Sequence, residues 1–376
     1  MRPGFLTWCT DMSLTTKFRS IVDHAAAEIA EALDYDVRRR SVEGFAHSAG
    51  RALAEATLWR KVSALDGLSW AISAERVQAT ENNFGQPGIT VLSRPEYRID
   101  LLYWLQNAAP RHGHVSNGAF AAVHGRRLLT TFTFDSIEQI DSRVTLGDLA
   151  SQPTTLMEEG ESAQISESLI HDLWWLEKPS MTISIRSAAR SNAADAREYW
   201  ESGVNIHPYQ LHSDSTVERQ LAALALMRLG SPVRYLVALE SIFREGSASL
   251  CCHAVEACRP DFEPEVRLLL RCVQDQSEVN STRLRLLARL EDALSWILQR
   301  RNLESLRATS TEGQLLAGLC WSGVTPADAA KLWRLEYATT ADASTALRDA
   351  ATAFVDPNLD ALDKVRTMAA SVLGCL

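Results

Sequence analysis

The stretch APRHGHVSNGAFAAVHG, residues 109–125, carries two histidines one residue apart, then a run of small and apolar side chains that ends at a glycine. Residues at i and i+2 of a β-strand point to the same face, so on a strand His112 and His114 reach toward one ion. By itself the H-x-H spacing is a weak signal, because paired histidines on a strand are more often incidental than ligands. A third ligand at a matching place would strengthen it.

The surrounding segment, from about residue 89 to 187, has the pattern of a β domain. Short apolar or alternating runs such as ITVLS, GAFAAVHG and MTISIR are separated by turns, which gives at least seven candidate strands in about 100 residues. These runs are rich in threonine, β-branched and aromatic residues, which are favoured in strands. The pattern predicts a single antiparallel β-sandwich or barrel.

Helical periodicity flanks this segment on both sides. Residues 14–80 are alanine-rich and repeat apolar side chains at helical spacing, and the turn-rich ENNFGQPGI (81–89) follows them. From about residue 193 to the end, apolar stripes again recur at helical spacing. The sequence therefore predicts an α+β fold with three regions, which are an N-terminal helical segment (1–85), a β-barrel (86–190) and a C-terminal all-helical domain (195–376).

Composition narrows the class of protein. The formal net charge of −9 over 376 residues argues weakly against nucleic-acid binding, and no apolar run reaches the about 18 residues of a membrane span. The N-terminus lacks a secretory signal, and either Met1 or Met12 is a possible start. We expect a cytoplasmic protein that binds neither nucleic acid nor membrane.

The seven cysteines are scattered and odd in number, which does not suggest a disulfide framework. Three of them fall in CCHAVEAC (251–258), where the spacing matches none of the usual C-x2-C pairs of zinc sites. The segment lies in a helical region, and free cysteine is among the most buried residue types. We expect these thiols to be reduced and packed in a core.

The histidine stretch resembles the first motif of the cupin superfamily, G-x5-H-x-H-x3-4-E-x6-G. His112 and His114 fill the two histidine places, and Gly125 fills the closing glycine. The sequence departs from the motif at its first glycine and at its glutamate, whose places fall on Gln106 and on Gly118 or Ala119.

The second cupin motif, G-x5-P-x-G-x2-H-x3-N, has its counterpart downstream. Gly160 and His171 stand eleven residues apart, as that motif requires. Its proline, second glycine and asparagine places hold Ser166, Ser168 and Trp175. The resemblance covers about 100 of the 376 residues and fills all three histidine places.

The absent glutamate leaves three neutral imidazoles, His112, His114 and His171, as the expected metal ligands. That set resembles the thiol dioxygenase branch of the cupins, of which cysteine dioxygenase is the best known, and also the diketone-cleaving cupins. The resemblance implies an Fe(II) cofactor, with a small chelating substrate and O2 as partners and no catalytic residue beyond the metal centre. The crosslinking cysteine of that branch falls on Ala119, so cysteine itself is not the favoured substrate.

Strand parity suggests which side chains line the pocket. Trp175 shares a face with His171, whereas Asp172 and Trp174 face away, and Arg111 has the opposite parity to His112. If Arg98 points into the barrel, its guanidinium suits a substrate carboxylate. If Arg98 points outward, it is an ordinary surface charge. Trp175 also suits plain core packing, and His124 suits a core or supporting histidine better than a fourth ligand. The candidate substrate-binding residues are Arg98, Tyr103, Phe120 and Trp175.

Two other functions remain open. A cupin isomerase or lyase uses a divalent metal such as Zn(II), Mn(II) or Ni(II) as a Lewis acid, and a non-catalytic cupin sensor uses a helical domain to bind a partner protein. Fold alone does not decide among these. The C-terminal helices are also a candidate surface for a homodimer.

Overall fold

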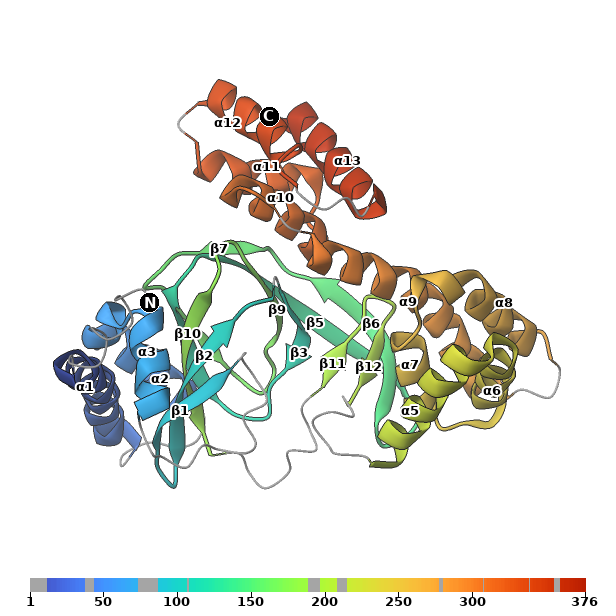
Figure 1. Cartoon of the computed structure of the whole chain (residues 1–376), viewed down its shortest axis with the longest axis horizontal. Coiled ribbons are helices and arrows are strands. Elements are labelled where there is room, and N and C mark those ends of the chain that lie inside the picture. Colours follow the sequence, from blue (N-terminus) through green and yellow to red (C-terminus); the bar gives the residue numbers. More distant parts are fainter. Residues whose placement is uncertain are drawn as a thin grey trace, which may run out of the picture.

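The computed structural model describes residues 12–37, 44–73, 87–106, 108–188, 197–207, 215–276, 280–306, 308–337, 339–354 and 359–376. A β-barrel lies between a small group of N-terminal helices and a larger C-terminal helical region (Figure 1). This is the α+β architecture that the sequence predicts, an antiparallel β-barrel with helical flanks. Most of the turn-rich segment ENNFGQPGI lies outside the described residues.

Two antiparallel sheets form the barrel. The strands are β1 (Gly88–Ser93), β2 (Tyr97–Trp104), β3 (Ala108–Gly113), β4 (Gly118–His124), β5 (Arg127–Gln139), β6 (Val144–Ser151), β7 (Thr155–Met157), β8 (Ser162–Ile165), β9 (Ile170–Trp175), β10 (Ser180–Ser187), β11 (Glu198–Tyr199) and β12 (Val204–Ile206). One sheet has the order β1-β2-β10-β4-β8 and the other β6-β12-β11-β3-β9-β5-β7. The long strand β5 pairs with β9 along its first half and with β6 along its second.

Several strands are buried on both faces, which explains their long apolar runs. On β4, Phe120 and Ala122 point into the barrel, whereas Ala119, Ala121 and Val123 point out toward helices. The same alternation continues on neighbouring strands, because successive side chains of a strand point to opposite faces. Each sheet therefore contributes to two cores, one inside the barrel and one under a helical layer.

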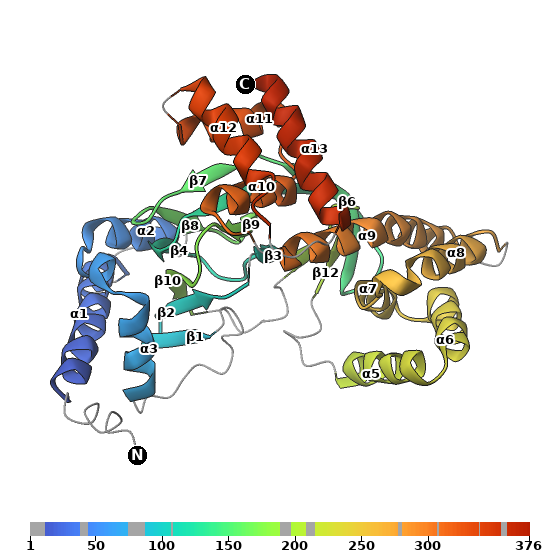
Figure 2. The ribbon, with the colours of Figure 1, turned by 45° about the horizontal axis from the view of Figure 1, so that its top comes forward.

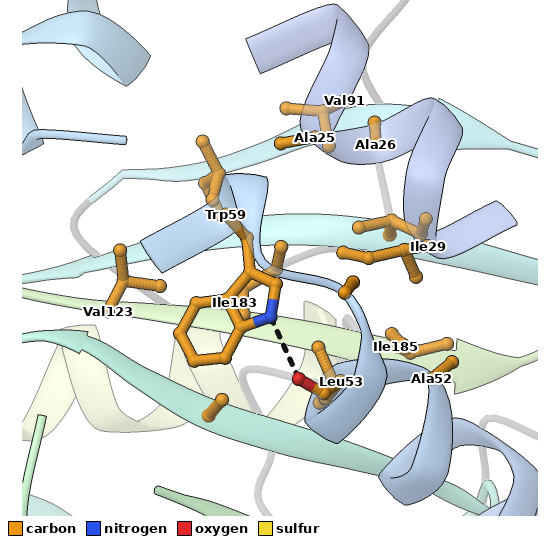
Figure 3. Close-up of a cluster of buried hydrophobic side chains, with 14 of the residues drawn as sticks. Ala25, Ala26, Ile29, Ala52, Leu53, Trp59, Val91, Val123, Ile183 and Ile185 are labelled. Carbon is orange, nitrogen blue, oxygen red and sulfur yellow. Dashed lines mark hydrogen bonds between the residues drawn. The ribbon is translucent and has the colours of Figure 1, made fainter. Parts of the chain in front are cut away.

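The N-terminal helices cover the outer face of the five-stranded sheet. They are α1 (Met12–Val37), α2 (Phe45–Glu55) and α3 (Ala64–Ser73), with a 3-10 turn η2 (Leu58–Lys61). Figure 3 shows this core, in which Ile29 and Trp59 from the helical layer lie close to Ile183 and Ile185 of β10. The Trp59 indole Nε1 donates a hydrogen bond of 2.9 Å to the carbonyl of Leu53, so its one polar atom is satisfied.

The C-terminal helices lie on the outer side of the seven-stranded sheet. They are α5 (Ser215–Gly230), α6 (Pro232–Glu245), α7 (Ala248–Glu256), α8 (Glu263–Gln274), α9 (Ser281–Ser305), α10 (Thr311–Ser322), α11 (Pro326–Leu335), α12 (Thr340–Ala350) and α13 (Leu359–Cys375), with a 3-10 turn η4 (Pro260–Phe262). Helix α10 packs on β9 and β5, and Figure 2 shows it lying over this end of the barrel. Trp174 of β9 is fully buried there, and its Nε1 donates a 2.9 Å hydrogen bond to the carbonyl of Gln314.

The barrel extends further along the chain than the sequence predicts. Beyond the expected boundary at residue 190, β11 and β12 complete the seven-stranded sheet, and the first C-terminal helix that the structure describes begins at Ser215. Strands of two and three residues are too short to give a periodic signal. His207 is buried directly after β12.

The cysteines of CCHAVEAC lie where the sequence predicts. Cys251, Cys252 and Cys258 are fully buried in the core that α6 to α9 share with the sheet. No helix in the part of the chain that the structure describes is both long and apolar enough to cross a membrane.

Candidate metal centre

The three predicted ligands meet at one end of the barrel interior. His112 lies on β3 and is directly opposite His171 on β9 in the antiparallel register, while His114 follows β3 by one residue. The register shifts between Ala109 and His112, as at a β-bulge. Each histidine offers one ring nitrogen, and these three nitrogens lie within 4.8 Å of one another.

One pair of these nitrogens has the spacing that a shared metal ion requires. The Nε2 atoms of His114 and His171 are 2.9 Å apart, and two nitrogens bound at right angles to one ion at about 2.1 Å would be about 3.0 Å apart. The Nδ1 of His112 lies 2.6 Å from the carbonyl oxygen of Pro110. Because a carbonyl only accepts, Nδ1 carries the proton and Nε2 keeps its lone pair for a metal.

The electrostatics keep the three imidazoles neutral. Burial lowers the pKa of His112 to about 4. Burial likewise holds the pKa of His114 and of His171 well below the usual value, and the neighbouring histidines lower both further. Neutral imidazole is the form that binds metal, so the ligand set is prepared for an ion without releasing protons at neutral pH.

The histidines open onto a small cavity of about 40 Å³ inside the barrel. Its wall is largely apolar, apart from the ligands, two hydroxyls and one guanidinium. The lining residues are Leu102, Trp104, Ala109, His112, His114, Phe120, Ile165, His171, Leu173, Thr182, Ser184 and Arg186. Below the cavity, Trp104 and Trp175 stack with their ring centroids 4.3 Å apart and close the floor.

The guanidinium in the cavity belongs to Arg186 of β10, which sequence reasoning missed. Its Nη2 donates a 3.0 Å hydrogen bond to Asp100 Oδ2, and Asp100 also accepts a 2.7 Å hydrogen bond from Thr90 Oγ1. The signal was present in MTISIR, where Thr182, Ser184 and Arg186 alternate with apolar residues. Such a polar face usually indicates solvent, but here it lines the barrel.

The candidate substrate-binding residues do not all line the cavity. Phe120 lines the cavity, with its ring centroid 5.6 Å from that of His171. Trp175 is fully buried in the floor. Arg98 lies outside the cavity lining, and its Nε is 3.0 Å from Asp100 Oδ2.

Tyr103 does not belong with them. It lies on the outer face of β2 in the core under the N-terminal helices, where its hydroxyl lies so close to Gly67 of α3 that a Cβ there would be 2.1 Å from it. The reason is strand parity, because Leu102 and Trp104 take the inward positions of β2.

The backbone explains why no carboxylate joins the histidines. A Cβ added at Gly118 would lie 1.9 Å from the carbonyl oxygen of Ile185 on the paired strand β10. Ala119, the other residue at the glutamate place, points out of the barrel. The two motif glycines have a structural role, since Gly125 and Gly160 adopt φ values of 79° and 88° in turns.

Comparisons with known proteins assign no family to this chain. No family model matches the sequence, and no curated protein matches it. Similar solved structures include that of the DMSP lyases RdDddP and RnDddQII, at 14% identity over 49% of this chain and 98% of that chain, with a TM-score of 0.29. Cobalt(II) HppE in complex with substrate has 14% identity over 46% of this chain and 98% of that chain, with a TM-score of 0.19.

An HTH_3 family transcriptional regulator from Vibrio cholerae is similar at 13% identity over 47% of this chain and 99% of that chain, with a TM-score of 0.19. Each of these structures aligns with less than half of this chain. At such low identity and TM-score the likeness carries no argument about activity, which must come from the geometry of the site.

Proposed function

We propose that this protein is a non-haem iron(II) oxygenase that acts with O2 on a small anionic substrate. The observation that carries the proposal is the combination of three neutral imidazoles with the guanidinium of Arg186 in one small, otherwise apolar cavity. His112, His114 and His171 would hold the iron. Neutral ligands leave its positive charge uncompensated, which favours an anionic, chelating substrate.

When bound, iron supplies the electrons that make O2 reactive and the open positions at which reactants meet. The chain supplies the rest. Arg186 opposes the charged end of the substrate, and its guanidinium matches the two oxygens of a carboxylate. Asp100 fixes that guanidinium by a 3.0 Å hydrogen bond. Leu102, Phe120 and Ile165 line the same cavity and exclude water from the reacting groups.

To test the proposal, the protein is purified anaerobically and its bound metal is measured. O2 uptake is then followed with a panel of small thiols, diketones and amino-acid derivatives. We expect bound iron and substrate-triggered O2 uptake. The Arg186→Gln variant should keep its iron and raise KM for an anionic substrate at least about tenfold, because a charge-assisted hydrogen bond is lost.

Two results would overturn the proposal. Metal-dependent turnover without O2 uptake would indicate Lewis-acid chemistry of an isomerase or lyase instead. Protein that never holds a metal, and that behaves identically after His112→Ala, would indicate a non-catalytic role such as sensing.

A further inference from the structure

A second cavity lies behind the metal centre, on the opposite face of β3 and β9. It has a volume of about 140 Å³ and lies between the barrel and helices α9, α10 and α13. Figure 2 shows α9 and α10 lying against this part of the barrel. The lining residues are Arg111, Asp172, Glu201, Trp296, Gln299, Arg300, Leu303, Cys320, Trp321, Gly323, Val324, Lys364 and Met368.

Arg111 is a buried cation whose ion pair with Asp172 is long. Its side chain is 6% exposed, and its Nε lies 3.5 Å from Asp172 Oδ2, too far for a good hydrogen bond. The guanidinium also stacks 3.9 Å from the ring centroid of Phe132, and its buried Nε has no hydrogen-bond partner among the described residues. Arg111 lines the second cavity, so an anion bound there would add to the compensation that Asp172 gives its charge.

Arg300 of α9 presents a second guanidinium to the same cavity. It is held between two indoles, 5.1 Å from the ring centroid of Trp296 and 4.6 Å from that of Trp321. Its carboxylate contacts, to Glu198 and Glu304, are both 3.5 Å long. Both carboxylates line the neighbouring cavity rather than this one, so they leave Arg300 only partly paired here.

The two guanidiniums repel each other across the cavity. Both guanidiniums line this cavity, so each adds to the cost of burying the other. Asp172 and Glu201 are the carboxylates of the lining, and Glu201 is exposed to solvent. Gln299 and Lys364 add further donors from exposed positions. Uncompensated buried charge is costly, which favours an anion that accepts hydrogen bonds from both arginines.

We propose that this cavity binds a small oxyanion, a carboxylate or phosphate group held between Arg111 and Arg300. Arg111 is next to His112 in the chain but points to the other side of β3, so the anion does not reach the candidate metal ligands. The site is therefore separate from the substrate cavity. It joins a residue of the barrel to a residue of the C-terminal helices, and its occupation stabilises their contact.

Trp296 and Trp321 line the cavity and provide the readout. Full-length protein is titrated with inorganic phosphate, and in parallel with acetate, at constant ionic strength held with chloride, while tryptophan fluorescence is recorded. We expect a saturable change and a raised melting temperature. Arg111→Gln and Arg300→Gln should each weaken binding at least about tenfold, because each removes charge-assisted hydrogen bonds. Arg285→Gln is the matched control, since Arg285 is on the same helix but 54% exposed and paired with Glu138.

The proposal fails if the wild-type protein shows no saturable response to either anion beyond that of chloride. It also fails if folded Arg111→Gln and Arg300→Gln variants bind as tightly as the wild type. Circular dichroism establishes folding. If Arg111→Gln does not fold, because Asp172 is left unpaired, Arg300→Gln and the wild-type titration decide the question.

Discussion

Gly118 occupies the place where the cupin resemblance calls for a glutamate, and the backbone leaves no room there for a side chain. Even a Cβ would lie 1.9 Å from the Ile185 carbonyl oxygen. We therefore expect Gly118→Ala to lower the free energy of unfolding by about 3 kcal/mol, as overpacking a tight site does. Chemical denaturation measures this. A stable Gly118→Glu variant that binds metal more tightly would contradict this explanation for the missing carboxylate.

The candidate metal ligands give the second prediction at this scale. His112→Ala should weaken binding of iron(II) by more than the about 10–100-fold that loss of a supporting hydrogen bond typically costs, because a ligand itself is removed. Anaerobic titration with iron(II) measures the affinity. His124→Ala is the control, since His124 is exposed at the end of β4 and its Nδ1 lies 3.0 Å from Glu159 Oε1. Equal affinities for iron(II) in the two variants would show that His112 is not a metal ligand.

Residues were predictable where spacing alone carries the information. The two-residue and eleven-residue spacings led to His112, His114 and His171, and the structure brings these together. Arg186 was not predictable in the same way, because its place in the cavity depends on β10 lying between β2 and β4. That pairing joins segments about 60 to 90 residues apart in the chain.

Helix α10 packs closely on the sheet at Gly318, where there is no room for a side chain. A Cβ on Gly318 would lie 2.4 Å from Trp174 Cδ1 and 2.8 Å from Leu128 Cδ1, both in the core under α10. We expect Gly318→Ala to lower the free energy of unfolding by about 2 kcal/mol, even though alanine is the better helix former.

Gly374 is the matched control for this prediction. It also lies in a helix, α13, and a Cβ there would meet no atom within 4 Å. Gly374→Ala should be neutral or stabilise the protein by up to about 1 kcal/mol, from helix propensity alone. Thermal and chemical denaturation of both variants measure the difference, and equal effects would show that α10 does not pack closely on Trp174.

Elements with many residues were easier to predict than short ones. The long periodic segments predicted the helices, and the short apolar or alternating runs predicted strands such as β4 and β10. The strands β11 and β12 have only two and three residues, so they depend on partners such as β3 and β6 for their existence. The sequence around them contains no pattern that distinguishes such strands from a linker.

At the scale of the whole molecule, the barrel and the C-terminal helices share their cores. Val144, Leu146 and Trp200 of the β region pack into one cluster with α6 to α9, and Leu128 and Trp174 into another with α10 to α13. The three-region division of the sequence suggests separable domains. The shared cores imply instead that the barrel depends on the helices that cover it.

A chain cut after residue 207 tests this dependence. The fragment 1–207 would expose the apolar outer face of the seven-stranded sheet, and exposed patches larger than a few hundred Å² promote association. We expect it to aggregate or bind a hydrophobic dye in size-exclusion and fluorescence experiments. Co-expression with fragment 215–376 is the control, because it restores the packing and omits only the connection. The pair should co-purify and melt near the temperature of the intact chain. A monomeric fragment 1–207 with the melting temperature and metal affinity of the whole protein would show that the barrel is independent of the helices.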